Sequence, residues 1–251
     1  MESVPKRRRR SGHLRCGGGL GLFEAVPELE TRGFRAFTTT RAAGSFATAG
    51  DASVGEVLGR WQRLQEVLAP YGTRLVTATQ VHGATIVVHT AGWAGWLRTG
   101  PADGHFSAVG GTALAVSVAD CVPLFIVHPS GAVALLHSGW RGTAARIVER
   151  AIALFADRGL VARDLIVHAG PAICGRCYEV SAEVYTQLTG TRPATARPTI
   201  DLRALIVAHA RTAGVRQTTV SAVCTRCDNN RFFSHRAGDA GRQIAALISP
   251  M

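Results

Sequence analysis

The sequence lacks a long hydrophobic run, and it is poor in aromatic residues and in lysine. No apolar stretch reaches the ~18 consecutive residues that a membrane-spanning helix needs, so a chain that spans a membrane is excluded. The basic residues near the start are followed by glycines and not by the apolar core of a secretory signal, which favours a cytoplasmic protein. Aromatic residues make up 6% of the chain, and no basic stripe is interleaved with them, as a nucleic-acid surface would require.

Several well-defined catalytic signatures are also missing. The chain has no G-x-x-x-x-G-K-[ST] phosphate loop and no G-x-S-x-G nucleophile turn. No histidine is followed two positions later by glutamate, which excludes the H-x-E family of zinc deaminases. The nine histidines form no H-x-H pair, which argues against oxidation at several copper centres.

The remaining composition is that of an ordinary globular protein. The chain has 251 residues, of which 47% are hydrophobic and 18% charged, enough to bury a core within one α/β domain. The net charge is +11, and nearly half of it lies in residues 1–15, where six basic residues face one acidic residue. We therefore expect a disordered basic tail over 1–20 and a catalytic domain over 21–251. A solvated tail is favoured; weak tail contacts with nucleic acid or an anionic surface are the alternative.

Hydrophobic periodicity predicts strands and helices in mixed order, without strict alternation. This order indicates an α/β or α+β layered domain and not a doubly wound sheet. The predicted strands cover 33–41, 75–88 in two runs hinged at 80–83, 112–127, 132–136, 165–167 and 218–223. The predicted helices cover 54–69, 143–157 with Thr143 as N-cap, 180–188 and 202–213. Because 112–127 is almost continuously apolar, it is typical of a strand buried on both faces.

Three apolar strands break off at polar residues beside glycine or proline, and such strand ends are where a rigid scaffold presents reactive groups. They offer His82, Cys121 and His137. Two imidazoles and a thiolate suit zinc or another late first-row metal, and three ligands leave one position open. The spacings match no local metal motif, so structural histidines and a buried cysteine remain alternatives. A nucleophile–base pair of Cys121 and His137 also remains open.

Two C-x-x-C pairs, Cys174/Cys177 and Cys224/Cys227, stand among the six cysteines. Two such pairs ordinarily suggest structural zinc. The gap between Cys177 and Cys224 is much longer than in a zinc ribbon, so unligated thiols are favoured. A zinc site made of all four cysteines and a redox pair are the alternatives.

The chain resembles the YfiH-type family, also labelled polyphenol oxidase, laccase domain and peptidoglycan editing factor. The resemblance runs in order from about residue 33 to 248. It rests on these segments: Gln80-Val81-His82-Gly83, Ala119-Asp120-Cys121-Val122-Pro123, His137-Ser138-Gly139-Trp140-Arg141-Gly142, Gly170-Pro171-Ala172-Ile173 with Cys177-Tyr178-Glu179-Val180, and Cys224-Thr225 leading to Phe232-Phe233-Ser234. Cys174 stands where the family has a glycine.

The resemblance implies a single layered α/β domain in which mixed sheets are flanked by helices. It also implies a metal site at His82, Cys121 and His137, usually occupied by Zn²⁺, with Cu²⁺ as the alternative. The implied activity is phosphorolysis of adenosine, inosine and methylthioadenosine, with deamination of adenosine. Its substrates are purine nucleosides and phosphate. Besides Cys121, the residues predicted to act in catalysis are Arg41, Asp120 and Arg141: the arginines as phosphate or purine donors, and Asp120 in proton transfer or in orienting a neighbour.

Other functions remain open at this stage. The first is a hydrolase that edits amino acids on cell-wall precursors, with Cys121 and His137 as nucleophile and base. The others are a copper-dependent polyphenol oxidase and a basic-tailed binding protein without enzyme activity. A monomer is the default expectation for the assembly.

Overall fold

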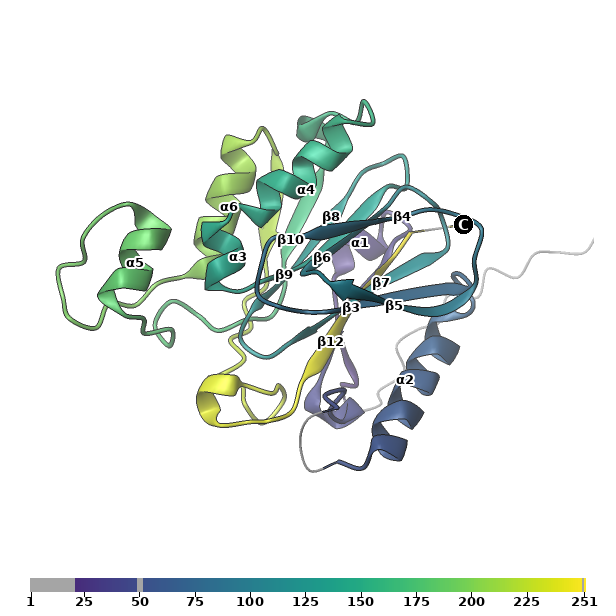
Figure 1. The fold of residues 1–251 in the computed structure, drawn as a ribbon, viewed down its shortest axis with the longest axis horizontal. Helices are drawn as coiled ribbons and strands as arrows, with labels where there is room; N and C mark the ends of the chain where they lie inside the picture. The colour runs from purple at the N-terminus through teal and green to yellow at the C-terminus, as the bar shows by residue number, and fades with distance from the viewer. Residues whose placement is uncertain (1–20, 49–51, 250) are drawn as a thin grey trace, which may run out of the picture.

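The computed structural model describes residues 21–48, 52–249 and 251, and it shows two six-stranded mixed β-sheets stacked on one another (Figure 1). The predicted tail, residues 1–20, lies outside the described residues. The apolar run predicted over 112–127 supplies a strand to each sheet. β7 (Thr112–Val118) lies in one sheet and β8 (Val122–Val127) in the other, and every residue of both strands except Ser117 is buried. The break at residues 119–121 is therefore a crossing between the two sheets.

The first sheet contains β7, and the second contains β8. In spatial order the first sheet is made of β1 (Phe23–Ala25), β2 (Arg35–Thr39), β12 (Gln243–Ile248), β7, β3 (Arg74–Thr79) and β5 (Gly95–Pro101). In spatial order the second is made of β11 (Gln217–Val220), β10 (Ile166–Ala169), β8, β9 (Val133–Ser138), β6 (Gly104–Ser107) and β4 (Ile86–His89). β3 pairs in parallel with β5 and β7, and β4 with β6, so both sheets are mixed.

Alternation of side chains along the strands creates the core between the sheets. Leu114 and Val116 of β7 point toward the second sheet, where they meet Phe125 and Val127 of β8. The intervening residues point away from this core. Ala113 and Ala115 pack on the outer side of the first sheet, and Leu124 and Ile126 on the outer side of the second.

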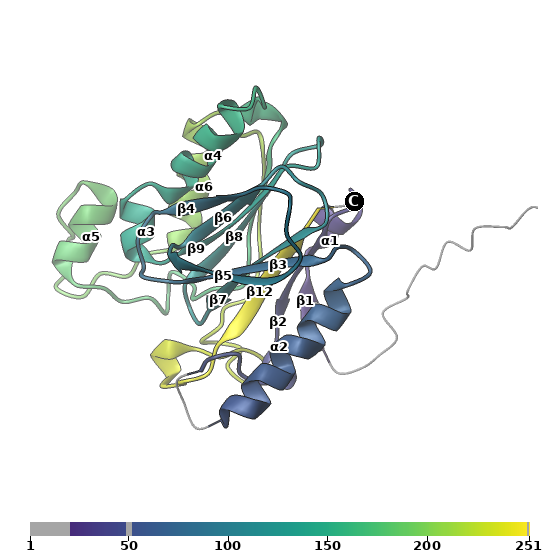
Figure 2. The ribbon, with the colours of Figure 1, turned by 45° about the vertical axis from the view of Figure 1, so that its right-hand side comes forward.

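Helices cover these two outer faces, which confirms the predicted layered α/β fold. α2 (Val54–Leu68) begins at Ser53, whose side chain accepts a hydrogen bond from the Glu56 backbone N–H, and it packs on the first sheet. α3 (Trp140–Ala144), α4 (Ile147–Ala156) and α6 (Leu202–Thr212) pack on the second sheet. Figures 1 and 2 show α2 on one side of the stacked sheets and these three helices on the other.

The remaining helices are short. α1 (Pro27–Glu30) follows β1, and α5 (Ala182–Thr189) follows β10. Single 3-10 turns cover Arg41–Ala43, Ala162–Asp164 and His235–Ala237.

The prediction of one helix over 143–157 was wrong. The helical region begins at Trp140, and Thr143 lies inside α3, where its hydroxyl donates to the Gly139 carbonyl oxygen at 2.9 Å. Arg146 then adopts a left-handed conformation (φ +59°) and separates α3 from α4. Strands β1, β5, β6 and β12 were not predicted. The residues of β5 are largely exposed, so their sequence carries no hydrophobic alternation.

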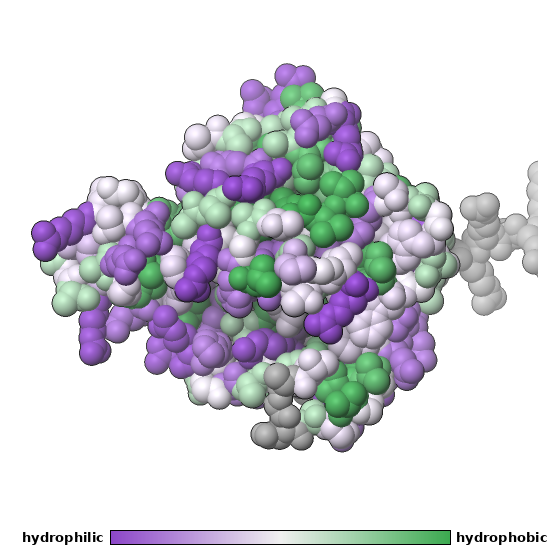
Figure 3. Space-filling model, in the orientation of Figure 1, coloured by the Kyte–Doolittle hydropathy of each residue, from purple (hydrophilic) through white to green (hydrophobic). Residues whose placement is uncertain are grey.

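No helix among the described residues is long and apolar enough to cross a membrane. On the face shown in Figure 3, hydrophobic residues gather in a few patches separated by hydrophilic ones.

A buried histidine pair links strands β4 and β6. Nε2 of His89 lies 3.0 Å from Nδ1 of His105, and both rings are buried. Burial lowers the pKa of His89 to about 4, and burial together with the charge of His89 lowers that of His105 to about 3. An unfolded chain protonates its histidines near pH 6.5. The pair is therefore neutral in the folded protein at pH values where the unfolded chain carries charge.

We expect the free energy of unfolding to fall as the pH drops below about 6.5, because the unfolded chain then binds protons that the folded protein does not. The variant His105→Gln should show a shallower loss than wild type in urea unfolding between about pH 7 and pH 4.5. His128→Gln, in the turn after β8, is the matched control and should keep the wild-type pH slope. If the free energy of unfolding depended equally on pH in all three proteins, the pH dependence would not come from the His89–His105 pair.

Candidate active site and metal centre

Three connections carry the chain from the first sheet to the second: residues 80–85 between β3 and β4, 102–103 between β5 and β6, and 119–121 between β7 and β8. Each of them supplies one polar residue to the same place: His82, Asp103 and Cys121. His137, near the end of β9, joins them, and its backbone N–H donates to the Asp103 carbonyl oxygen at 2.7 Å. The crossings therefore gather residues that are distant in the sequence.

The three residues that the sequence offered as metal ligands lie together. One ligand atom from each of His82, Cys121 and His137 falls within 4.8 Å of the other two. The two imidazole rings meet edge to face, with centroids 4.7 Å apart. His137 is buried, Cys121 is half-buried and His82 is exposed, so the group opens to solvent on the His82 side.

The buried carboxylate of Asp103 contacts the side chain of His137 and the backbone around His82. Its Oδ1 lies 2.8 Å from Nδ1 of His137. The same carboxylate accepts hydrogen bonds from the backbone N–H groups of Val81, His82 and Gly83, at 3.3, 2.9 and 2.6 Å. With Nδ1 of His137 engaged in this way, Nε2 is left to face Cys121. A ring nitrogen bound to a carboxylate is the usual second contact of a metal-ligating histidine.

The charges of these groups are strongly coupled. Burial opposes ionisation of Cys121, but the charge of His137 and hydrogen bonds from His137 and His82 lower the pKa of the thiol to about 6. Burial also opposes protonation of His137, yet the Cys121 thiolate and Asp103 raise the pKa of the imidazole to about 9. Burial raises the pKa of Asp103, but His137 and the backbone N–H groups of His82 and Gly83 lower it by more. The net effect is a lowered pKa. Without a metal, Cys121 and His137 therefore stabilise each other's charged forms.

Two glycines allow the segment after β9 to pass close to this group. A Cβ on Gly139 would lie 2.9 Å from Sγ of Cys121 and 3.3 Å from Cδ2 of His82. A Cβ on Gly142 would lie 2.9 Å from the Gly83 carbonyl oxygen. Any larger side chain at Gly139 must push the sulfur or the imidazole out of place.

Asp120 lies next to Cys121 but is directed elsewhere. Its carboxylate accepts a hydrogen bond from the Thr225 hydroxyl at 2.6 Å and another from the Arg236 backbone N–H at 2.7 Å. Asp120 and His82 both have positive φ angles, of 81° and 60°, which are uncommon outside glycine. Unusual backbone of this kind collects at functional sites, where surrounding contacts hold it in place.

A cavity of about 910 Å³ opens over the ligand group. One wall is aromatic: Trp61 of α2 stacks on Trp96 of β5 with centroids 4.8 Å apart, and Phe46 meets Trp61 edge to face. Tyr178, from the segment between β10 and α5, also lines the cavity, and burial together with the charge of Cys121 raises the pKa of its hydroxyl to about 12. The cavity has the size and apolar lining of a small-molecule site.

The remaining lining is basic. Asp120 is the one carboxylate among the described lining residues, whereas four arginines border the cavity: Arg98, Arg141, Arg236 and Arg242. The Arg141 guanidinium stacks over the Trp140 ring at 4.3 Å, and it makes no hydrogen bond to another described residue. A cavity with this charge balance favours an anionic ligand.

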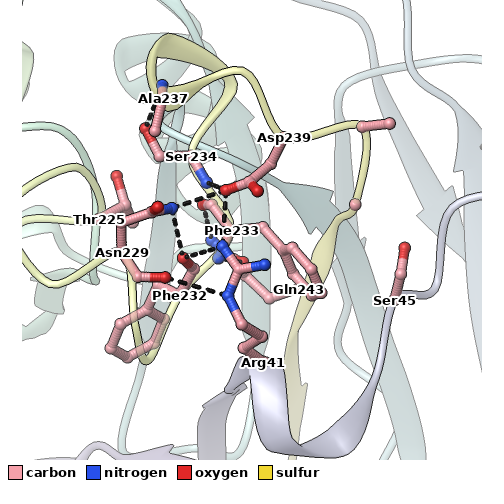
Figure 4. Close-up of polar contacts among 12 residues, drawn as sticks. Arg41, Ser45, Thr225, Asn229, Phe232, Phe233, Ser234, Ala237, Asp239 and Gln243 are labelled. Carbon is pink, nitrogen blue, oxygen red and sulfur yellow. Dashed lines mark hydrogen bonds and ion pairs between the residues drawn. The ribbon is translucent and has the colours of Figure 1, made fainter.

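Arg41, predicted as a catalytic or phosphate-binding group, is held by protein contacts (Figure 4). Its Nε donates to the Asn229 carbonyl oxygen at 3.0 Å, and one Nη donates to Asp239 at 2.7 Å and to the Phe232 carbonyl oxygen at 3.2 Å. The guanidinium also stacks over the Phe233 ring. Arg41 is not among the described residues that line the cavity. The structure thus brings His82, Asp120, Cys121, His137 and Arg141 to one cavity and sets Arg41 apart.

Sequence reasoning missed Asp103 and the pair Trp96 and Arg98. All three lie in residues 90–111, for which no element was predicted. Asp103 carried no comparable signal, because the strand that follows it, β6, is four residues long and contains one large apolar residue, Phe106.

A family model described as "Multi-copper polyphenol oxidoreductase laccase" matches residues 42–249. The chain belongs to this family. The match includes every ligand and cavity residue named above, and Arg41 lies one residue before it; the match agrees with the resemblance found in the sequence motifs.

Solved and curated members of the family give closer comparisons. Purine nucleoside phosphorylase YlmD of Geobacillus stearothermophilus is 36% identical over 214 residues, covering 76% of this chain and 78% of YlmD. Its crystal structure superposes with a TM-score of 0.77 and covers 87% of this chain and 93% of that one. YfiH of Bacillus licheniformis, at 23% identity, has the same fold, with a TM-score of 0.80 over 91% of this chain and 96% of that one.

A further relative carries a different name. Adenosine deaminase RL5, from an unknown prokaryotic organism, is 35% identical over 139 residues, which is 50% of this chain and 53% of that protein. Relatives of this chain are thus named for two reactions of purine nucleosides.

The close approach at Gly139 can be tested directly. With Zn²⁺ as the probe, Gly139→Ala should weaken metal binding at His82, Cys121 and His137 by about tenfold or more, since displacing groups around a ligand typically costs 10–100-fold in metal affinity. Zinc affinity is measured by competition with a chromophoric chelator, and far-UV circular dichroism checks the fold. Gly55→Ala is the matched control, because a Cβ at Gly55 of α2 has no atom within 4 Å. Wild-type zinc affinity in Gly139→Ala would refute this view of the site.

Proposed function

We propose that residues 21–251 form a zinc-dependent purine nucleoside phosphorylase. The reaction converts adenosine, inosine or methylthioadenosine and phosphate to the free base and the sugar 1-phosphate, and deamination of adenosine is a second activity. One observation carries this proposal: a ligand group of two imidazoles and a thiolate lies in a cavity with an aromatic wall and an arginine-rich rim. The names of the relatives support the same reaction class.

His82, Cys121 and His137 would hold the metal. The donor set fits zinc, because two imidazoles and one thiolate are ordinary zinc ligands and three protein ligands leave a position open. Asp103 supports the same assignment, since it binds Nδ1 of His137 and leaves Nε2 free for the metal. When bound, Zn²⁺ supplies Lewis-acid chemistry and lowers the pKa of water to about 7, as deamination at the purine C6 requires.

The arginines account for the phosphate. Arg141 carries its charge on the cavity rim and forms no ion pair with a carboxylate of the described residues, and Arg98 and Arg236 line the same space. Arginine binds phosphate oxygens through two parallel hydrogen bonds, which fixes the nucleophile as well as attracting it. In phosphorolysis a phosphate oxygen forms a bond to C1′ of the sugar while the C1′–N9 bond breaks. The electron pair of that bond leaves with the purine, which takes up a proton.

The aromatic wall accounts for the base. The stacked pair of Trp61 and Trp96 lines the cavity, and Trp96 is the more exposed of the two. We assign this pair to the purine, because stacking of a base on an aromatic side chain is worth about 1–3 kcal/mol per base. The Tyr178 hydroxyl stays protonated at neutral pH because its pKa is about 12, so it remains a hydrogen-bond donor in the cavity.

Asp120 and Arg41 receive narrower roles in this proposal. Asp120 orients the segment that carries Arg236, since its two oxygens accept from Thr225 and from the Arg236 backbone. Arg41 orders the loop from Asn229 to Asp239, which precedes the cavity residue Arg242. Direct phosphate binding by Arg41 stays a prediction of the family resemblance.

The proposal is tested by incubating the purified protein with adenosine or inosine, with and without phosphate, and separating the products chromatographically. We expect free base only when phosphate is present, and inosine from adenosine in both cases. Cys121→Ala should lose more than about 100-fold in kcat/KM, because loss of a neighbouring contact alone costs 10–100-fold in metal affinity or activity. Base release that ignores phosphate, or no base at all from zinc-loaded protein, would contradict phosphorolysis.

Arg141 provides a second test. Arg141→Ala should raise the KM for phosphate about tenfold or more, since a charge-assisted hydrogen bond contributes about 1.5–3 kcal/mol. The KM for phosphate of Arg141→Lys should lie between those of wild type and Arg141→Ala, because lysine keeps the charge but not the planar, two-pronged guanidinium. Arg163→Ala, an exposed arginine outside the cavity, is the control. An unchanged KM for phosphate in Arg141→Ala would remove this residue from the phosphate site.

One observation favours a second candidate, the cysteine hydrolase. Cys121, His137 and Asp103 are coupled in the order nucleophile, base and orienting carboxylate. Metal content separates the two functions, because a Cys121 thiolate bound to zinc is not a free nucleophile. Multi-copper oxidation has less support, since the described residues bring together just one histidine-containing ligand group.

A further inference from the structure

A second ligand group lies beside the cavity, and none of its residues belongs to the cavity lining. Cys174 and Cys177 follow β10, Cys224 and Cys227 follow β11, and the four sulfur atoms all lie within 4.8 Å of one another. Sγ of Cys177 is 3.4 Å from Sγ of Cys227. The sequence favoured unligated thiols because the two pairs are far apart in the chain. β10 and β11 are parallel neighbours, however, so the segments that leave their carboxyl ends emerge at the same edge.

The two C-x-x-C segments are both tight turns. The backbone N–H groups of Cys177 and Tyr178 donate to the Cys174 carbonyl oxygen at 2.9 and 3.0 Å, and that of Asp228 donates to the Cys224 carbonyl oxygen at 2.9 Å. Each turn directs its two sulfurs toward the other turn. Gly175 makes the first turn feasible, because a Cβ there would lie 2.8 Å from the Asp201 side chain.

Backbone donors surround one of the sulfurs. Sγ of Cys224, the buried member, accepts from the backbone N–H groups of Cys174 and Cys227 at 3.3 and 3.4 Å. Each turn also contains an arginine, Arg176 and Arg226, and the latter donates to the Cys177 carbonyl oxygen at 3.1 Å. Four thiolates around one divalent cation carry a net charge of −2, which two arginines offset.

The dimensions match tetrahedral zinc. With a Zn–S distance of about 2.3 Å, the sulfurs of a tetrahedral site are about 3.8 Å apart. Sγ of Cys177 and Sγ of Cys227 lie 3.4 Å apart, and no two sulfurs of the group are more than 4.8 Å apart, so the group is compact enough for such a site. All four of these cysteines are free thiols in the structure, so no disulfide accounts for their approach.

We propose that Cys174, Cys177, Cys224 and Cys227 form a structural Zn²⁺ site, separate from the ligand group of His82, Cys121 and His137. Four protein ligands close the coordination sphere, so this ion has no open position for substrate. Its role is to tie together two loops that border the cavity. The first loop carries Tyr178, and the second carries Thr225, whose hydroxyl holds Asp120.

The test is elemental analysis of the full-length protein purified without chelator. We expect about two zinc ions per chain in wild type, one in Cys177→Ser/Cys227→Ser and one in Cys121→Ala. The two variants report on different sites, so failure of the active-site metal and failure of this site are distinguishable. Unchanged zinc content in the double variant, or iron in place of zinc at these cysteines, would overturn the proposal.

A measurement on wild-type protein covers the case in which the double variant does not fold. Iodoacetamide labelling followed by peptide mass spectrometry should find all four cysteines protected in the zinc-loaded protein and labelled after chelation. Cys227 is the most informative of the four, because its side chain is exposed and burial does not protect its sulfur from the reagent. Rapid labelling of Cys227 in zinc-loaded protein, or a disulfide-linked peptide in place of free thiols, would refute the site.

Discussion

The carboxylate of Asp103 is the contact on which the rest of the site depends. It is fully buried, it binds the imidazole of His137, and it accepts three backbone hydrogen bonds from residues 81–83. A buried carboxylate is costly unless donors surround it, and here four donors do. Because those donors come from two different parts of the chain, satisfying this one charge sets the position of His82 relative to His137.

The stacked-sheet architecture explains why the donors are available at that point. Three strands of the first sheet, β3, β5 and β7, are each followed along the chain by a strand of the second sheet. A short connection joins the two strands in each case. Backbone groups in these connections have left both sheets and need other partners. Asp103 meets this need for residues 81–83, and the same carboxylate binds His137, which lines the cavity. One side chain therefore serves both the fold and the site.

The sequence revealed the parts of the site that are attached to strong patterns. His82, Cys121 and His137 each interrupt or end an apolar strand, and a break in such a strand is visible without a structure. Asp103 was not found because β5 is exposed and β6 has four residues, so neither gives a periodicity that would frame it. The break at Arg146 could not be predicted either, since a left-handed arginine has no sequence signature comparable to glycine.

The four-cysteine group shows a different limit. Spacing along the chain argued against a shared metal, and it was the parallel pairing of β10 with β11 that brought the two turns together. Sequence separation is a guide to metal sites built on one hairpin. It carries little information when the ligands follow neighbouring parallel strands, because the intervening helices can be of any length.

Zinc affinity in Asp103→Asn tests the central claim most directly. The substitution keeps the size of the side chain but removes its charge and turns one acceptor into a donor that faces backbone N–H groups. We expect zinc binding at His82, Cys121 and His137 to weaken about 10–100-fold in chelator competition, with the far-UV circular dichroism spectrum unchanged. Asp157→Asn, an exposed aspartate after α4, is the control. Wild-type zinc affinity in a folded Asp103→Asn protein would contradict the account.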